Sequence, residues 1–253
     1  MSRAQEIEIL ERSLKEYKDN PILLAPFLIL TLVGWVLAYF LTQTEEWLLA
    51  IPMLLIIFLS LTGLASMSAK VAASGKCELS DWWTGVRNYF WNLLAVSIIV
   101  GLIVGILVDS PSRLIFFDQP PSIVSRSYHA FTASVADFLL FVCYAAVMVD
   151  HSGPWTSIKR GWKAIRASGR ISLSFLVILF IVSEMRIFVA SETVLSNSSF
   201  TSILSSYFTL PSIGYTIFQL LLDPLWFLIG FAIYLKFSET AKKTSEPIQE
   251  EAT

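Results

Sequence analysis

Residues 88–108, NYFWNLLAVSIIVGLIVGILV, contain no charged side chain. Roughly 20 apolar residues cross the ~30 Å hydrocarbon core of a bilayer as one α-helix, so this stretch is long enough to span a membrane. Residues 21–44 and 47–69 are equally long and equally free of charge. These stretches predict a chain that crosses the membrane several times.

The second half of the chain contains longer apolar stretches that are interrupted by single charges. The composition of the whole chain, 55% hydrophobic and 15% charged with a mean hydropathy of +0.66, excludes a soluble globular protein of this size. We therefore predict an all-α polytopic membrane bundle of six transmembrane helices. The expected spans are 21–43, 47–68, 89–109, 127–149, 171–190 and 212–236.

Segments flank this predicted six-helix domain, residues 21–237, on both sides. Residues 1–20 form a charged lead that is longer than the usual start of a signal peptide, and no small-residue cleavage site follows Gln43. We therefore expect residues 1–20 to be a cytoplasmic amphipathic helix and 21–43 to be a retained span. Residues 238–253, rich in Ser, Thr, Lys and Glu, predict a disordered cytoplasmic tail.

The cations of this chain are grouped in a way that predicts its orientation. Fifteen of the eighteen Lys and Arg residues lie in residues 1–20, 68–90, 150–170 and 236–243. Cytoplasmic loops of membrane proteins collect Lys and Arg near the ends of spans. This distribution predicts a multi-pass protein of the cell (plasma) membrane with both termini in the cytoplasm, which requires an even number of spans.

Amphipathic segments border the predicted spans. Ile7, Leu10, Leu14 and Tyr17 recur at helical spacing in the first segment. A third segment, 79–90, is rich in aromatic residues, and Ser80 is its expected N-cap. The clearest segment is 153–168, where Pro154 is expected in the first turn and Trp155, Ile158, Trp162 and Ile165 form one apolar stripe.

A basic helix that carries Trp is typical of a helix lying in the headgroup layer of a membrane. The alternatives are that these segments only anchor the protein, or that they also bind anionic lipid headgroups or a membrane-protein partner. The candidate surface site for anionic lipid comprises Trp155, Lys159, Arg160, Trp162, Lys163 and Arg166.

Two of these features resemble a known superfamily. Asn20-Pro21 at the start of the first span, and Ser157-Ile158-Lys159-Arg160-Gly161-Trp162-Lys163-Ala164 before the fifth, are similar to a loose superfamily of six-span prokaryotic (archaeal and bacterial) membrane proteins of unknown function. That superfamily includes the membrane domain fused to some glycerophosphodiester phosphodiesterases. Its members often have Ser at the position of Gly161. The resemblance implies a six-span fold and a membrane location, and it implies no activity, because the phosphodiesterase chemistry belongs to a separate soluble barrel.

Charged residues inside the predicted spans are the best candidates for a function within the membrane. Such residues cost roughly 2.5–3.5 kcal/mol each at the centre of a span. At ~1.5 Å per residue, Asp137, Glu184, Arg186 and Asp223 are all expected in one layer, just outside the midplane. Either Arg186 pairs with an acid for structural reasons, or the four line a polar site of a proton-coupled carrier. Pro224, next to Asp223, could kink the last span there.

Several function classes are not supported by the sequence. It contains no H-E-x-x-H, G-x-S-x-G, Walker A or Rossmann motif, so we expect no catalytic residues and no enzyme. Cys77, Cys143, His129 and His151 are not spaced for a metal site, and we expect neither a metal nor a cofactor. A net charge of −2 gives no reason to expect nucleic acid. Open alternatives are a non-catalytic scaffold for membrane or lipid-handling proteins, a small-solute or proton-coupled carrier, and an enzyme acting on lipid.

Overall fold

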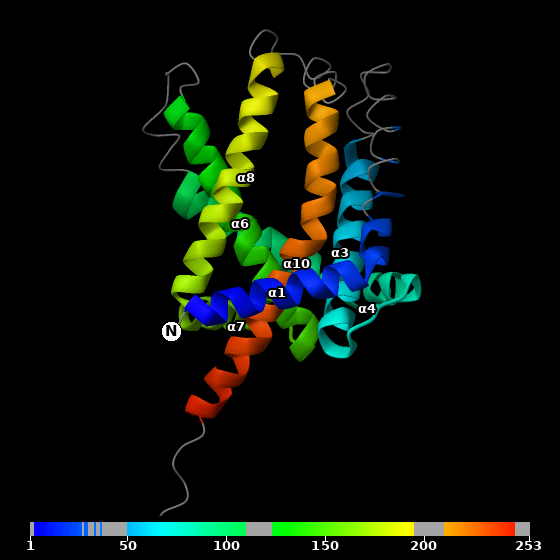
Figure 1. Ribbon diagram of the computed structural model, residues 1–253, viewed down its shortest axis with the longest axis vertical. Coiled ribbons are helices and arrows are strands. Elements are labelled where there is room, and N and C mark those ends of the chain that lie inside the picture. Colours follow the sequence, from blue (N-terminus) through cyan, green and yellow to red (C-terminus); the bar gives the residue numbers. More distant parts are fainter. Residues whose placement is uncertain are drawn as a thin grey trace, which may run out of the picture.

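The computed structural model describes residues 3–26, 28–29, 33, 36, 50–109, 123–194 and 210–245. Every secondary-structure element in these ranges is a helix. The long helices rise from one end of the molecule, and two shorter helices, α1 and α7, cross that end (Figure 1). The elements are α1 (Arg3–Asp19), η1 (Pro21–Leu24), α3 (Ala50–Ser74), α4 (Leu79–Val104), η3 (Gly105–Asp109), α6 (Ile123–Asp150), α7 (Pro154–Ser168), α8 (Arg170–Val194) and α10 (Leu210–Ser245).

Within the described ranges, four helical segments are long and apolar enough to cross a membrane. They are Leu55–Ser74, Leu79–Leu107, Ser127–Asp150 and Leu221–Ser238. The bent pair α7 and α8 adds a fifth crossing if it is counted as one span. The all-helical class is therefore confirmed, with four or five candidate spans among the described residues, whereas the count of six stays a prediction. The expected first span, 21–43, lies largely outside the described residues.

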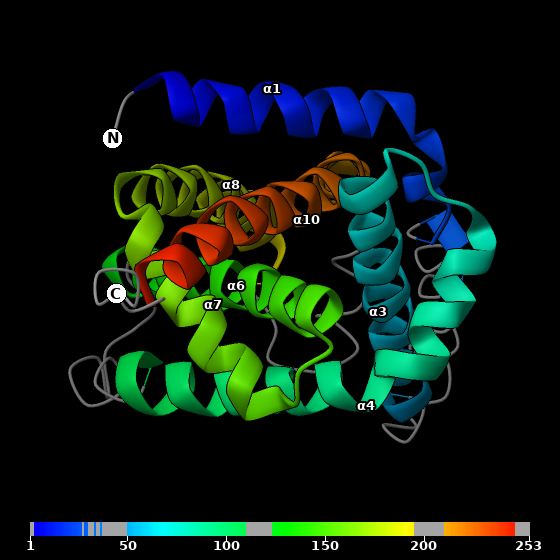
Figure 2. The ribbon, with the colours of Figure 1, turned by 90° about the horizontal axis from the view of Figure 1, so that it is seen from below.

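The last helix, α10, stands in the middle of the molecule. In the end-on view it lies between α3, α6 and α8 (Figure 2). Of its apolar segment Leu221–Ser238, 67% is buried inside the protein, against 22% of the segment Leu79–Leu107 that begins with α4. Phe227, Phe231 and Tyr234 of α10 are fully buried, and the Phe227 ring meets the Phe141 ring of α6 edge-on, with 4.9 Å between centroids. The core is thus built around α10, and α4 lies at the periphery.

Small residues allow neighbouring helices to approach closely. A Cβ added to Gly85 of α4 would lie 2.1 Å from the Cβ of Ser66 on α3, and one added to Gly161 of α7 would lie 2.8 Å from the Sγ of Cys143 on α6. Close packing at small residues is how helices associate in a membrane, where no hydrophobic effect drives them together. The helix contacts therefore depend on these positions.

Local sequence explains where the helices at the crossed end begin and turn. Glu78 and Asp81 form a capping box at the start of α4, with Asp81 accepting from the Glu78 amide at 2.8 Å. The N-cap is therefore Glu78 and not Ser80, and residues 79–90 belong to the continuous helix α4. Gly169, with φ +44°, joins α7 to α8 at a bend of 102°.

The helix α10 also differs from what the sequence predicts. It contains Pro224 in its interior and is helical on both sides of it. It continues to Ser245, so the first part of the expected tail, 238–253, is helical, and residues 246–253 lie outside the described ranges. Lys236, nine residues before Ser245, pairs with Glu8 of α1 at 2.6 Å.

Candidate functional site

The crossing helix α1 is fastened to the bundle by Asn20, the residue that ends it. Asn20 is 4% exposed, and its amide donates to the carbonyls of Glu16 at 2.8 Å and Gly75 at 3.0 Å. Its side-chain oxygen accepts from the backbone N–H of Cys77 at 3.3 Å. Gly75 has φ +78°, which lets the chain turn from α3 into α4 at this point. One side chain therefore joins α1 to the turn between α3 and α4.

Charged contacts connect α1 with the other basic segments. Arg12 Nη2 donates to the carbonyl of Ala72 at 3.2 Å, and Glu6 lies 3.5 Å from Arg170. Glu8 pairs with Lys236 at 2.6 Å. The first cation block, 1–20, thus touches each of the blocks 68–90, 150–170 and 236–243. Segments far apart in the sequence meet at one end of the molecule.

The helix α1 presents three different sides. Ile9 and Ser13 are buried against the bundle, 3% and 0% exposed. Leu10 and Leu14, the next residues along, are exposed together with Ile7. Of the predicted stripe, Ile7, Leu10 and Leu14 therefore do not pack on the protein, whereas Tyr17 is half-buried against the core. The charged residues occupy the third side, and Lys15, Lys18 and Glu11 are among those exposed there.

The helix α7 has the same three sides. Its buried side consists of small residues: Ser157, Gly161, Ala164 and Ser168. The predicted stripe is largely outward, with Trp155 56% and Trp162 52% exposed and Ile158 and Ile165 half-buried. Lys159 Nζ lies over the Trp155 ring, 5.6 Å from its centroid. Lys163 and Arg166 are exposed, so five of the six predicted surface residues lie open beside one another.

The sixth predicted surface residue, Arg160, is also exposed, 45% for its side chain, but it is paired with an acid of the bundle. Arg160 Nη1 lies 2.7 Å from Oδ2 of Asp150, whose side chain is 10% exposed. The same oxygen accepts from the hydroxyl of Tyr234 on α10. Next to it, Tyr89 of α4 is hydrogen-bonded to His151 Nδ1 at 2.6 Å. This network was not predicted. The one feature of the sequence that points to it is the acid Asp150, directly after the predicted span 127–149.

The three acids of the predicted intramembrane charge cluster stand at one level of the structure. Asp137 lies 13 residues before Asp150, Glu184 14 residues after Arg170, and Asp223 13 residues before Lys236. Asp150, Arg170 and Lys236 all lie at the crossed end, so the three acids are each ~20 Å from it along their helices. They stand on α6, α8 and α10 respectively. Arg186 is on α8, and its side chain lies outside the part that the structure describes.

Polar contacts between α6 and α8 occur at this level. Ser134 Oγ, on a fully buried residue, donates to Ser183 Oγ at 3.0 Å. Glu184 Oε1 is buried and has no hydrogen-bond partner among the described residues. Asp137 and Asp223 each take part in an interaction. Since the side chain of Arg186 lies outside the described part, the shared network of the four charges stays a prediction.

Comparisons with known proteins give no functional assignment. No protein-family model, no curated protein and no solved structure matches the chain. The resemblance to six-span prokaryotic membrane proteins therefore stays a prediction. Among the described residues, no group of three or more His, Cys, Asp or Glu side chains could hold a metal ion.

Proposed function

We propose that this chain is a non-catalytic membrane scaffold whose cytoplasmic end carries a collar in the headgroup layer. The collar consists of α1 and α7. It offers a basic, Trp-bearing surface to anionic lipid and to partner membrane proteins. The observation that carries the proposal is the shared three-sided arrangement of these helices. Each has one side buried on the protein, one apolar side that is largely exposed, and one charged side.

The direction of the apolar sides supports a position in the membrane surface. In Figure 2, α1 runs from left to right along the upper edge and α7 runs upward on the left, so both circulate clockwise around α10. Along a right-handed helix the next residue is turned clockwise by about 100°. In both helices, a residue that faces α10 is therefore followed in the sequence by a residue whose side chain points along the long helices, away from the viewer of Figure 2. Leu10 follows Ile9, and Trp162 follows Gly161.

Fluorescence quenching tests the placement of the collar. In a chain without its native cysteines, an NBD fluorophore is attached to Leu10→Cys or, as the control on the same helix, to Lys15→Cys. Both proteins are reconstituted in vesicles of phosphatidylcholine brominated in its acyl chains. We expect strong quenching at position 10 and weak quenching at position 15. Equal quenching at both positions would refute the collar.

Lipid selectivity tests the function itself. Spin-labelled phosphatidylglycerol should associate with the protein in preference to phosphatidylcholine, because Lys159, Lys163 and Arg166 are exposed on α7. Replacing these three by Gln should reduce that preference several-fold. Replacing Arg160 alone should change it little, since its guanidinium is held by Asp150. An unchanged preference in the triple variant would contradict the proposal.

A carrier is the second candidate function, and one observation favours it. The Oε1 of Glu184 is buried and has no hydrogen-bond partner among the described residues, and the preceding residue, Ser183, contacts Ser134 of α6. Such a group can exchange a proton if water reaches it. Proton uptake by proteoliposomes that is lost in Glu184→Gln and retained in Glu11→Gln would support the carrier. No uptake by the native chain would exclude it.

A further inference from the structure

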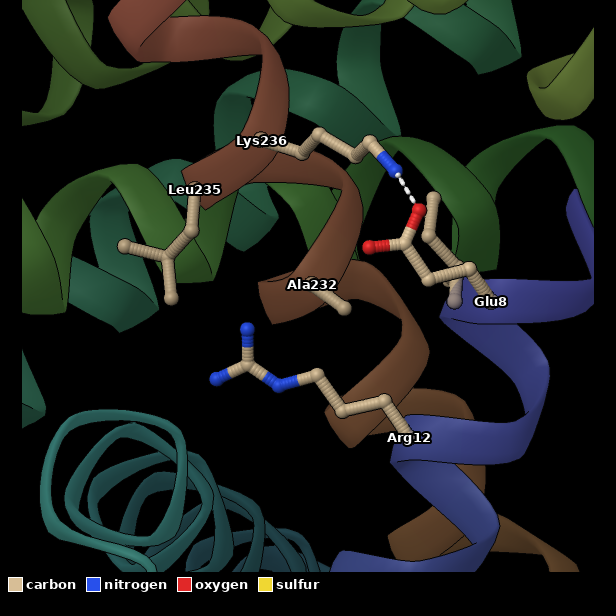
Figure 3. A pocket seen from close by; sticks show the side chains of 6 residues that line it. Glu8, Arg12, Ala232, Leu235 and Lys236 are labelled. Carbon is tan, nitrogen blue, oxygen red and sulfur yellow. Dashed lines mark hydrogen bonds and ion pairs between the residues drawn. The ribbon is translucent and has the colours of Figure 1, made fainter. Parts of the chain in front are cut away.

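A cavity lies between the crossing helix α1 and the lower part of α10. Its volume is about 340 Å³, and its lining comes from one face of each helix: Glu8, Ile9, Arg12, Ala232, Leu235 and Lys236. Arg12 and Lys236 lie on opposite edges of this space, and the apolar side chains lie between them (Figure 3). We propose that this cavity binds the phosphate group of a phosphate-bearing ligand, and that its source is the headgroup of an anionic phospholipid.

The guanidinium of Arg12 is positioned by the protein and retains unused donors. Its Nε donates to Glu16 at 2.8 Å and its Nη2 to the carbonyl of Ala72 at 3.2 Å. Arginine has five N–H donors in a fixed plane, and no other group in the described part of the chain accepts from this one. A guanidinium edge of this kind matches two phosphate oxygens. The two existing hydrogen bonds fix the plane of the guanidinium and leave its other N–H donors available.

The second cation, Lys236, is held by an acid that can leave. Lys236 Nζ pairs with Glu8 Oε2 at 2.6 Å, but the Glu8 side chain is 69% exposed and that of Lys236 only 28%. Glu8 is therefore easily rehydrated, and its rotation into water removes this acid from the edge of the cavity beside the Lys236 ammonium. Glu8 competes with a bound anion. Removing its charge should strengthen binding.

The position of the cavity along α10 favours a lipid headgroup. Lys236 lies two residues before the end of the apolar segment Leu221–Ser238. This is the boundary between hydrocarbon and headgroups, where lipid phosphate is the abundant anion. The lipid source rests on the proposed placement of α1 at the membrane surface.

Binding of dioctanoyl phosphatidic acid to the full-length protein in detergent, followed by calorimetry, tests this site. We expect Arg12→Gln to weaken binding about tenfold or more, and Arg12→Lys to weaken it less. Glu8→Gln should tighten it several-fold, a gain that misfolding cannot produce. Lys15→Gln on the same helix and Lys163→Gln on α7 are controls and should bind as the native chain does. Affinity that is unchanged in both Glu8→Gln and Arg12→Gln would overturn the proposal.

Further experiments distinguish a lipid phosphate from a soluble one, and the phosphate site from the proposed scaffold. Inorganic phosphate and glycerol 3-phosphate are titrated alone and against the lipid. Binding of phosphatidic acid alone supports the lipid source. Equal binding of inorganic phosphate, still dependent on Arg12, overturns that source and leaves a site for a soluble phosphate. Strong quenching at Leu10→Cys with no Arg12-dependent binding refutes the site and leaves the scaffold intact. The converse result leaves the site and refutes the scaffold.

Discussion

The contact between α3 and α4 predicts that replacing Gly by Ala has different effects at two positions of α4. In α4, Gly85 faces Ser66 and Gly101 faces open space. An alanine at position 85 would bring its Cβ to 2.1 Å from the Ser66 Cβ, whereas ordinary contacts begin near 3.4 Å. The helices must therefore separate by roughly 1.3 Å at this point, and overpacking of this kind costs about 1–3 kcal/mol.

The comparison between the two positions isolates this steric cost. Replacing Gly by Ala in a helix gains up to about 1 kcal/mol of helix propensity at either position. Gly101→Ala should therefore be neutral or stabilising, because nothing lies near the added methyl. Gly85→Ala should be less stable than Gly101→Ala by about 1–3 kcal/mol. The free energies of unfolding are measured by SDS titration in mixed micelles, followed by circular dichroism.

A double-mutant cycle determines whether the clash with Ser66 is the cause. An alanine Cβ at position 85 would lie 3.5 Å from the Cα of Ser66, an ordinary contact, so removing the Ser66 side chain restores the space. In a Ser66→Gly chain, Gly85→Ala should be neutral or stabilising. The reasoning fails if Gly85→Ala is as stable as Gly101→Ala, or if Ser66→Gly does not relieve it.

Two further predictions concern the crossed end of the bundle. Burial, with the charge of Asp81, raises the pKa of the Cys77 thiol to about 11. In a Cys143→Ala chain, maleimide labelling of Cys77 at pH 8 should be about a hundredfold slower than that of an ordinary thiol, and it should keep rising to pH 11; a rate that levels off by pH 9 would contradict this. Asp150→Ala should lower the free energy of unfolding by about 1–3 kcal/mol, because it leaves the buried Tyr234 hydroxyl without its acceptor, whereas Tyr234→Phe should cost only about 1 kcal/mol. Equal losses in the same SDS titration would refute that assignment.

The helical membrane class could be predicted from the sequence because hydropathy along the chain reports span length directly. The described spans Leu79–Leu107 and Ser127–Asp150 overlap the predicted spans 89–109 and 127–149. The crossing helix α7 was also predictable, since Gly153-Pro154 starts it and its cations cannot enter the bilayer. The boundaries were less accurate where a helix continues into water, as at the start of α4 and the end of α10.

Which side of α1 packs on the protein could not be predicted from its apolar pattern. In a soluble protein the apolar side of a helix faces the core. In α1 and at its end the buried residues are Ile9, Ser13 and Asn20, whereas Ile7, Leu10 and Leu14 are exposed. A membrane offers a second apolar environment, so hydrophobicity alone does not distinguish protein from lipid. The distinction requires the partners, and Asn20 finds them 55 and 57 residues away.

The cations at the crossed end serve two purposes that their clustering in the sequence does not separate. Arg12, Arg160, Arg170 and Lys236 are each paired with an acid of the same end, so they add little net charge to the surface and hold the helices together. Lys159 lies over a tryptophan, and Lys15, Lys18, Lys163 and Arg166 are exposed. In the proposed scaffold, attraction to anionic lipid therefore comes mainly from this second group. Orientation depends on the number of cations, whereas lipid recognition depends on which of them the fold leaves unpaired. The cavity at Arg12 combines both purposes, because the bonds that fasten α1 to the bundle also aim its guanidinium.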